Sequence, residues 1–134
     1  MTSKQIEDIS YVIIEWCMNT FKRSKYHKDL PLVIVKYAHE RYKNCYGEYD
    51  IKYNIMFIYS KRNRAVLQLV NTIIHEFVHH LQSPNWTMRY LEKYGRKVNK
   101  NPYEIEAYTI SNKFNIICAK EIEKKVNKIL KKRR

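Results

Sequence analysis

The chain has 134 residues and a formal net charge of +13, from 26 Lys and Arg against 13 Asp and Glu. This length suits one domain with one modest core, so we expect residues 1–134 to form a single domain. No positively charged start precedes an apolar run, and no long uncharged apolar stretch occurs. We therefore expect neither a signal peptide nor a membrane span, and no membrane partner.

The three cysteines, Cys17, Cys45 and Cys118, are an odd number, lie far apart and form no CxxC pair. This pattern favours a reducing compartment and predicts no disulfide framework. We therefore expect a cytoplasmic protein, either of a cell or of a phage or virus that acts in the cytoplasm of its host.

The excess of positive charge has two interpretations. Clustered Lys and Arg can replace counterions on phosphates, so nucleic acid is a possible partner. However, the basic residues are spread along the chain, and Lys, Asn, Ile and Tyr are all abundant, as an AT-biased genome would produce. The one true cluster lies in residues 124–134, where it either contacts nucleic acid or forms a solvated helix end whose cations suit the helix dipole. It consists of Lys124, Lys125, Lys128, Lys131, Lys132, Arg133 and Arg134.

The first predicted element is a helix of about five turns. Thr2 and Gln5 resemble a capping box, in which each side chain satisfies a free backbone N–H at the helix start. Apolar residues then recur at helical spacing, which predicts a helix with one face against a sheet. These residues are Ile6, Ile9, Ile13, Trp16 and either Thr20 or Phe21.

Three short extended segments follow. Pro31 ends a short segment that interrupts regular secondary structure. Residues 32–35 are β-branched or apolar, as in a buried strand. Two more extended runs follow, one over residues 45–51, which contain Gly47, and one over residues 54–59. Together they predict one small three-stranded sheet.

The second half of the chain is predicted to be helical. A polar turn at residues 61–64 leads into a helix over residues 65–83. The run Ser-Pro-Asn at residues 83–85 ends that helix. A short helix over 86–94 and a loop over 95–101 follow. Pro102 suits the first turn of a last helix that runs to about residue 130. The order of helix, strands and helices predicts an α+β fold.

The most informative segment contains His75, Glu76 and His79, which fit the pattern H-E-x-x-H. On a helix, residues four apart lie on the same face, so both imidazoles can bind one metal ion while the glutamate reaches a water molecule on that ion. The pattern indicates a zinc hydrolase. The competing interpretation is an amphipathic helix with two surface histidines and no metal.

The periodicity of this helix separates the two histidines from its core. A projection at 100° per residue gives one broad apolar face, made of Val66, Leu69, Val70, Ile73, Ile74, Phe77 and Leu81. The opposite face holds Gln68, Thr72, His75, His79 and Gln82. His80 falls nearer the apolar side, so we expect it to be a packing or capping residue rather than a ligand.

A catalytic zinc ion needs three protein ligands and one open position. No histidine follows His80, but Glu104 and Glu106 open the predicted last helix. They lie about 200° apart on a helix, so only one of them can face the metal. Both glutamates flank the apolar stripe of that helix. Periodicity therefore does not decide which of them is the third ligand.

The motif at residues 75–79, followed by the Glu-x-Glu-Ala run ending at Ala107, resembles the gluzincin metallopeptidases, especially the ImmA/IrrE-like and the Ste24/HtpX-like peptidase domains. The resemblance implies a minimal zincin-like domain, a zinc ion held by His75, His79 and Glu104, and a peptide or protein substrate. It implies that Glu76 activates the zinc-bound water. Members of the family often carry Asp where this chain has Tyr108. The Tyr108 hydroxyl could support an imidazole or stabilise the oxyanion, and the competing interpretation is an ordinary packing role.

The same resemblance implies an edge strand above the cleft, which could pair with an extended peptide. Residues 45–49 and 55–59 are the two candidates for that strand. Cys45 could touch the metal as a blocking thiolate, but a single cysteine of this kind is more often simply buried. The leading prediction is a zinc metallopeptidase, and the alternative is a nucleic-acid-associated protein with a structural or vestigial zinc site.

Overall fold

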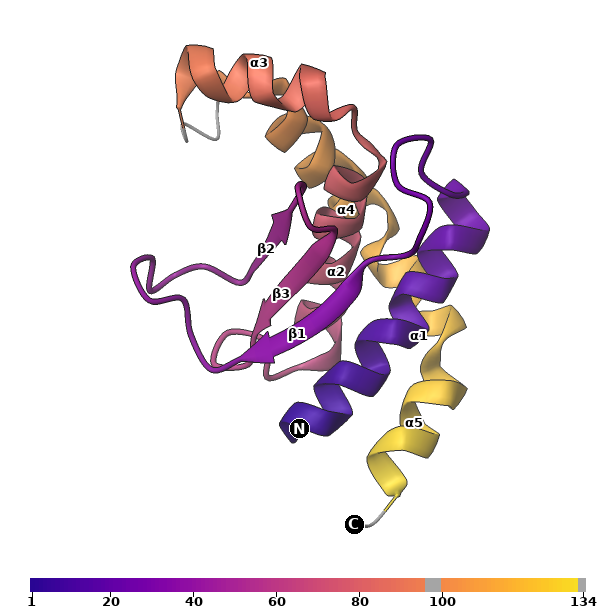
Figure 1. Ribbon diagram of the computed structural model, residues 1–134. Helices are drawn as coiled ribbons and strands as arrows, with labels where there is room; N and C mark the ends of the chain where they lie inside the picture. The colour runs from indigo at the N-terminus through magenta and orange to yellow at the C-terminus, as the bar shows by residue number, and fades with distance from the viewer. Residues whose placement is uncertain (96–99, 133–134) are drawn as a thin grey trace.

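The computed structural model describes residues 1–95 and 100–132, which form an α+β fold of five helices and one three-stranded mixed sheet (Figure 1). The predicted fold class is confirmed. The elements in chain order are α1 (Ser3–Phe21), β1 (Leu32–Lys36), β2 (Gly47–Asp50), β3 (Ile55–Tyr59), α2 (Val66–Leu81), α3 (Pro84–Tyr94), α4 (Pro102–Glu121) and α5 (Glu123–Lys131).

Helix α1 begins as its sequence predicts. The Thr2 side chain accepts a hydrogen bond from the Gln5 backbone N–H at 3.1 Å, and the Gln5 side chain accepts one from the Thr2 N–H at 2.8 Å. The capping box is therefore confirmed. The apolar face of α1 is fully buried at Ile6, Ile9 and Ile13.

The sheet has the strand order β1-β3-β2, with β1 parallel and β2 antiparallel to the central β3. Its inner face, which includes Val33, Met56 and Ile58, is buried in the core. Because β3 is paired on both sides, residues 55–59 are wrong as one of the two candidates for the edge strand, and the other candidate, residues 45–49, overlaps the edge strand β2. The edge strand beside the motif helix is β2, which is shorter than the predicted 45–51 segment.

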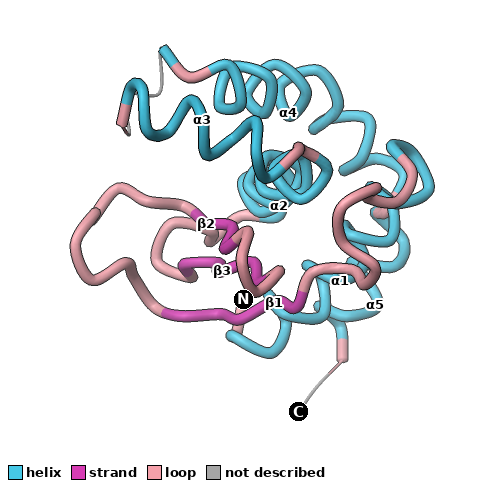
Figure 2. Tube along the Cα trace, turned by 45° about the horizontal axis from the view of Figure 1, so that its top comes forward, coloured by secondary structure: helices cyan, strands magenta, loops and turns pink. Residues whose placement is uncertain are grey.

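Helix α2 is central to the molecule, with α1, α4 and the sheet around it (Figure 2). The predicted apolar face is confirmed, since five of its residues have no exposed surface: Leu69, Val70, Ile73, Ile74 and Phe77. This burial fixes the rotation of α2 about its axis. The histidine-bearing face is thereby turned away from the core.

Helix α3 begins two residues earlier than the predicted 86–94. Ser83 caps it by accepting a hydrogen bond from the Trp86 N–H, and Pro84 occupies the first turn, where no backbone N–H is needed. Ser83 and Pro84 thus start a helix as well as ending the previous one. Of the predicted loop at 95–101, residues 96–99 lie outside the described part of the chain.

The single last helix predicted for residues 102–130 is wrong in one respect, because the chain bends at Ile122 and forms two helices. Ile122 and Val126 are buried, and Val126 is the one buried residue of α5. The bend brings this apolar side against α1, so that α5 runs beside α1 (Figure 1). Burial of both side chains stabilises the bend.

No helix within residues 1–95 and 100–132 combines the length and apolar character needed to cross a bilayer.

Candidate metal centre

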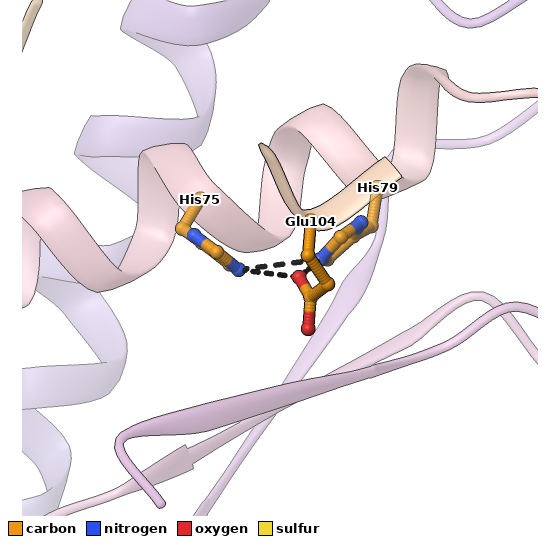
Figure 3. Close-up of side chains that lie close together, drawn as sticks. All are labelled: His75, His79 and Glu104. Atoms are coloured by element: carbon orange, nitrogen blue, oxygen red, sulfur yellow. Dashed lines mark hydrogen bonds and ion pairs between the residues drawn. The ribbon is translucent and has the colours of Figure 1, made fainter. Parts of the chain in front are cut away.

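Three side chains from two helices converge at one point. His75 and His79 lie one turn apart on α2, and Glu104 lies in the first turn of α4 (Figure 3). Glu104 Oε1 is 3.0 Å from His75 Nε2 and 2.6 Å from His79 Nε2, and the two nitrogens are 3.2 Å apart. Within the described residues, this is the group of His, Cys, Asp and Glu side chains that could hold a metal ion.

The donor set fits a transition metal. Two imidazole nitrogens and one carboxylate oxygen are the ligands of many catalytic zinc sites, with bonds of about 2.0–2.2 Å. A tetrahedral ion with such bonds separates its ligand atoms by roughly 3.4 Å. The three atoms here are 2.6 to 3.2 Å apart, so outward shifts of less than one ångström would admit the ion.

The proximity of these groups changes their proton affinities. Burial raises the pKa of Glu104, but the hydrogen bonds from His75 and His79 outweigh it and hold that pKa well below its usual range. Burial lowers the pKa of His79, while the hydrogen bond to Glu104 and the nearby Glu76 carboxylate raise it to a net value of about 9. The neighbouring carboxylates therefore favour the protonated, positively charged form of the His79 imidazole.

Glu76 lies beside the three converging residues and is only 6% exposed. Burial raises the pKa of its carboxyl group, against the opposing effect of the two neighbouring histidines. A carboxylate with a raised pKa is a better proton acceptor at neutral pH than an ordinary surface glutamate. Its position and its chemistry both suit a general base.

The site lies in a cleft of about 720 Å³ between β2, α2, α3 and α4. Gly47 of β2 forms part of its wall, and a Cβ atom there would lie 2.8 Å from Thr72 Cγ2 and 3.4 Å from Glu76 Cγ. A larger residue at this position would therefore have to displace the Thr72 side chain or β2 itself. Opposite it, α3 contributes Met88 and Leu91 to the lining.

The structure separates the two candidate glutamates. Glu104 meets both imidazoles, whereas Glu106 accepts a hydrogen bond from Gln82 Nε2 at 2.9 Å. Gln82 also contacts His79, and this contact was not predicted. Its position on the same polar face, three residues after His79, is the one sequence signal that could have indicated it.

Tyr108 also lies at the site. Its ring centroid is 4.4 Å from that of His75, it lines the cleft and it is 46% exposed. Burial of the hydroxyl and the nearby Glu104 carboxylate raise its pKa, so the hydroxyl keeps its proton at neutral pH. A protonated phenol can donate a hydrogen bond to a group bound in the cleft.

Two further residues, Cys45 and His80, make contacts that are typical of structural residues rather than of metal ligands. Cys45 lines the cleft, but its thiol donates to the Gly47 carbonyl oxygen at 3.2 Å and it is not a member of the metal-binding group. His80 is 1% exposed, and its Nδ1 lies 2.9 Å from Asn54 Oδ1 and 3.2 Å from the Tyr49 hydroxyl. The prediction that His80 is a packing residue is confirmed.

Of the basic cluster at the end of the chain, Lys124, Lys125, Lys128 and Lys131 lie on α5, and Lys132 follows it. These lysines are exposed, and Lys125 forms an ion pair with Glu15 of α1 at 3.2 Å. Arg133 and Arg134 lie outside the described residues. Neither α5 nor its lysines line the cleft.

The chain matches no family model, no curated protein and no solved structure. Its likeness to the gluzincins therefore stays a prediction that rests on residues 75–79 and 104–107.

Proposed function

We propose that the protein is a zinc-dependent metallopeptidase. The observation that supports this proposal most strongly is the convergence of His75, His79 and Glu104 beside the buried Glu76 in an open cleft. A structural zinc site is usually closed by four protein ligands, whereas a catalytic site keeps a position open. Three protein ligands at a cleft floor favour the catalytic kind.

Zinc held by these three side chains would polarise the scissile carbonyl and acidify a water molecule. Glu76 then accepts a proton from the attacking water as its oxygen bonds to the carbonyl carbon. The same carboxyl group returns the proton to the amine nitrogen as the C–N bond breaks, so that water is added across the peptide bond. The Tyr108 hydroxyl donates a hydrogen bond to the developing oxyanion.

The substrate is held as an extended strand. β2 is paired with β3 on one side only, and residues of β2 line the cleft. Backbone groups on its other side can pair with a peptide by strand addition. We place this activity in the cytoplasm, where the thiols of Cys17, Cys45 and Cys118 would remain free, as they are in the structure.

The test compares the wild type with Glu76→Gln, which keeps the size of the side chain and removes its basicity. Zinc content and cleavage of a mixed peptide library are measured for both proteins. The variant is expected to keep its zinc and to lose at least about 100-fold in turnover, the usual contribution of a general base. Glu123→Gln, an exposed carboxylate on α5, serves as the control and is expected to cleave normally.

The proposal is contradicted if the zinc-loaded wild type cleaves no peptide. It is equally contradicted if Glu76→Gln cleaves as fast as the wild type, because the proton transfer would then need another acceptor.

A further inference from the structure

The ring nitrogen of His79 that faces away from Glu104 has its own partner. His79 Nδ1 lies 2.7 Å from Gln82 Oε1, one turn further along the chain. The other end of the Gln82 amide reaches α4, where Nε2 donates to the Tyr103 carbonyl oxygen at 2.8 Å and to Glu106 Oε1 at 2.9 Å. Gln82 is only 5% exposed.

These partners fix the orientation of the amide. A backbone carbonyl and a carboxylate can only accept hydrogen bonds, so the NH₂ end of Gln82 must face Tyr103 and Glu106. The carbonyl end must then face His79. Because a carbonyl oxygen can only accept, His79 must carry a proton on Nδ1.

This proton determines which nitrogen of His79 can bind a metal. With Nδ1 protonated, a neutral imidazole has its lone pair on Nε2, the atom that lies 2.6 Å from Glu104 and 3.2 Å from His75 Nε2. The hydrogen bond to Gln82 also restricts rotation of the ring. Gln82 therefore holds His79 in the tautomer and orientation that the metal site needs.

We propose that Gln82 and Glu106 are a positioning pair for the metal site: Glu106 orients the amide of Gln82, and Gln82 orients the imidazole of His79. This inference rests on the proposed metal site and goes beyond it, because neither residue is a ligand. It also gives both glutamates of the Glu-x-Glu pair a role. Glu104 meets the histidines directly, and Glu106 acts on one of them through Gln82.

A merely structural role is a distinct alternative. Gln82 is the C-cap of α2 and its amide joins α2 to α4, so its loss could simply loosen the packing. A structural role predicts a change in the unfolding free energy of the metal-free protein. A positioning role predicts a change in metal affinity and in the metal's coordination, even where the fold is intact.

The experiment measures the zinc dissociation constant by competition with a chromophoric chelator, and the visible spectrum of the cobalt-loaded protein. Gln82→Glu keeps an acceptor for His79 but removes the donor to both Glu106 and the Tyr103 carbonyl oxygen, and it sets two carboxylates side by side. It is expected to weaken zinc binding about 10- to 100-fold, the usual effect of losing an outer hydrogen-bond partner, and to alter the cobalt spectrum. Glu106→Gln retains an acceptor oxygen and is expected to bind within about threefold of the wild type.

The double variant Gln82→Glu with Glu106→Gln is the decisive member of the series. The amide and the carboxylate exchange places, so residue 106 can donate to residue 82, which still accepts from His79, while the bond to the Tyr103 carbonyl oxygen stays lost. Because only the bond between residues 82 and 106 is restored, part of the lost affinity is expected to return. The matched control is Gln68→Glu, which adds the same charge to the same face of α2, where the side chain contacts Thr72 rather than a ligand. Its cobalt spectrum is expected to match that of the wild type.

The inference is overturned if Gln82→Glu binds zinc as tightly as the wild type with an unchanged cobalt spectrum, or if the double variant recovers no affinity. Both measurements are made without a substrate, so they are independent of peptidase activity. If the wild type itself binds no zinc, the metal site and the proposed function fail together.

Discussion

Glu104 Oε1 lies 2.6 Å from His79 Nε2, although 25 residues separate them along the chain. The contact depends on how α4 lies along α2, with Tyr103, Ala107 and Ser111 of α4 buried. Two of these buried residues, Ala107 and Ser111, have small side chains. The ligand set is therefore a product of helix packing, and changes that disturb the elements around α2 should also disturb the site.

The close approach of β2 to α2 should make Gly47 sensitive to substitution. In Gly47→Ala the new Cβ would lie 2.8 Å from Thr72 Cγ2 and 3.1 Å from the Phe57 carbonyl oxygen, so β2 or the Thr72 side chain must shift. We expect a loss of about 1–3 kcal/mol in the free energy of unfolding, as for other overpacked sites. Urea denaturation measures this loss.

A second substitution tests whether the Thr72 methyl group causes that loss. Thr72→Ser removes Cγ2 and retains the hydroxyl that donates to Asn63 at 2.7 Å. Gly47→Ala should therefore destabilise the Thr72→Ser protein less than it destabilises the wild type. An equal loss in both backgrounds would show that the contact with Thr72 is not the cause.

Asn54 is expected to be important for stability because it joins three parts of the chain in a left-handed turn. Its φ is +56°, its Nδ2 donates to the Asp29 carbonyl oxygen at 2.9 Å, and its Oδ1 accepts from the Tyr49 hydroxyl at 2.7 Å. Asn54→Ala loses these bonds and places a Cβ-bearing residue without a compensating side chain in the left-handed region. We expect a loss of about 2–4 kcal/mol in the free energy of unfolding.

Asn54→Gly separates the two contributions. Glycine adopts positive φ without steric cost but makes none of the side-chain hydrogen bonds. Its unfolding free energy, measured in urea, should fall between those of the wild type and the alanine variant. A glycine variant less stable than the alanine variant would contradict this account of the turn.

The two buried thiols should be chemically inert in the folded protein. Burial raises the pKa of Cys118 to about 12 and that of Cys17 well above its ordinary value. The thiolate is the reactive form, so at pH 8 Cys118 should react on the order of 10³-fold more slowly than an ordinary thiol. Alkylation followed by mass analysis of peptides measures this, with the unfolded chain as the control. Rapid labelling of either residue in the folded protein would contradict their burial.

Local patterns in the sequence were sufficient for much of the fold. The capping box at Thr2 and the apolar periodicity of α2 depend on neighbouring residues, and both were predicted correctly. The pairing order of the strands depends on contacts between distant segments, and the central position of β3 was missed. The bend at Ile122 was missed for the same reason, since it depends on burial against α1 and involves no Pro or Gly.

The candidate site shows the same division between features that neighbouring residues determine and features that depend on contacts between distant segments. His75, Glu76 and His79 share one helix, so their spacing was enough to place them together. The choice between Glu104 and Glu106 depends on the rotation of α4 relative to α2, which the periodicity of α4 did not indicate. The role inferred for Gln82 depends on that same relation, because its amide bonds to α2 and α4 residues at once.

The most direct test of the metal site is the zinc bound per chain in the wild type, Glu104→Ala and Glu106→Ala at one fixed free zinc concentration well above the wild-type dissociation constant, measured by equilibrium dialysis and elemental analysis. The wild type and Glu106→Ala should each bind about one zinc ion per chain, the latter more weakly, because all three ligands remain. Glu104→Ala should bind well below one, since two imidazoles alone hold zinc weakly. One zinc ion retained in Glu104→Ala, or none in the wild type, would contradict the account.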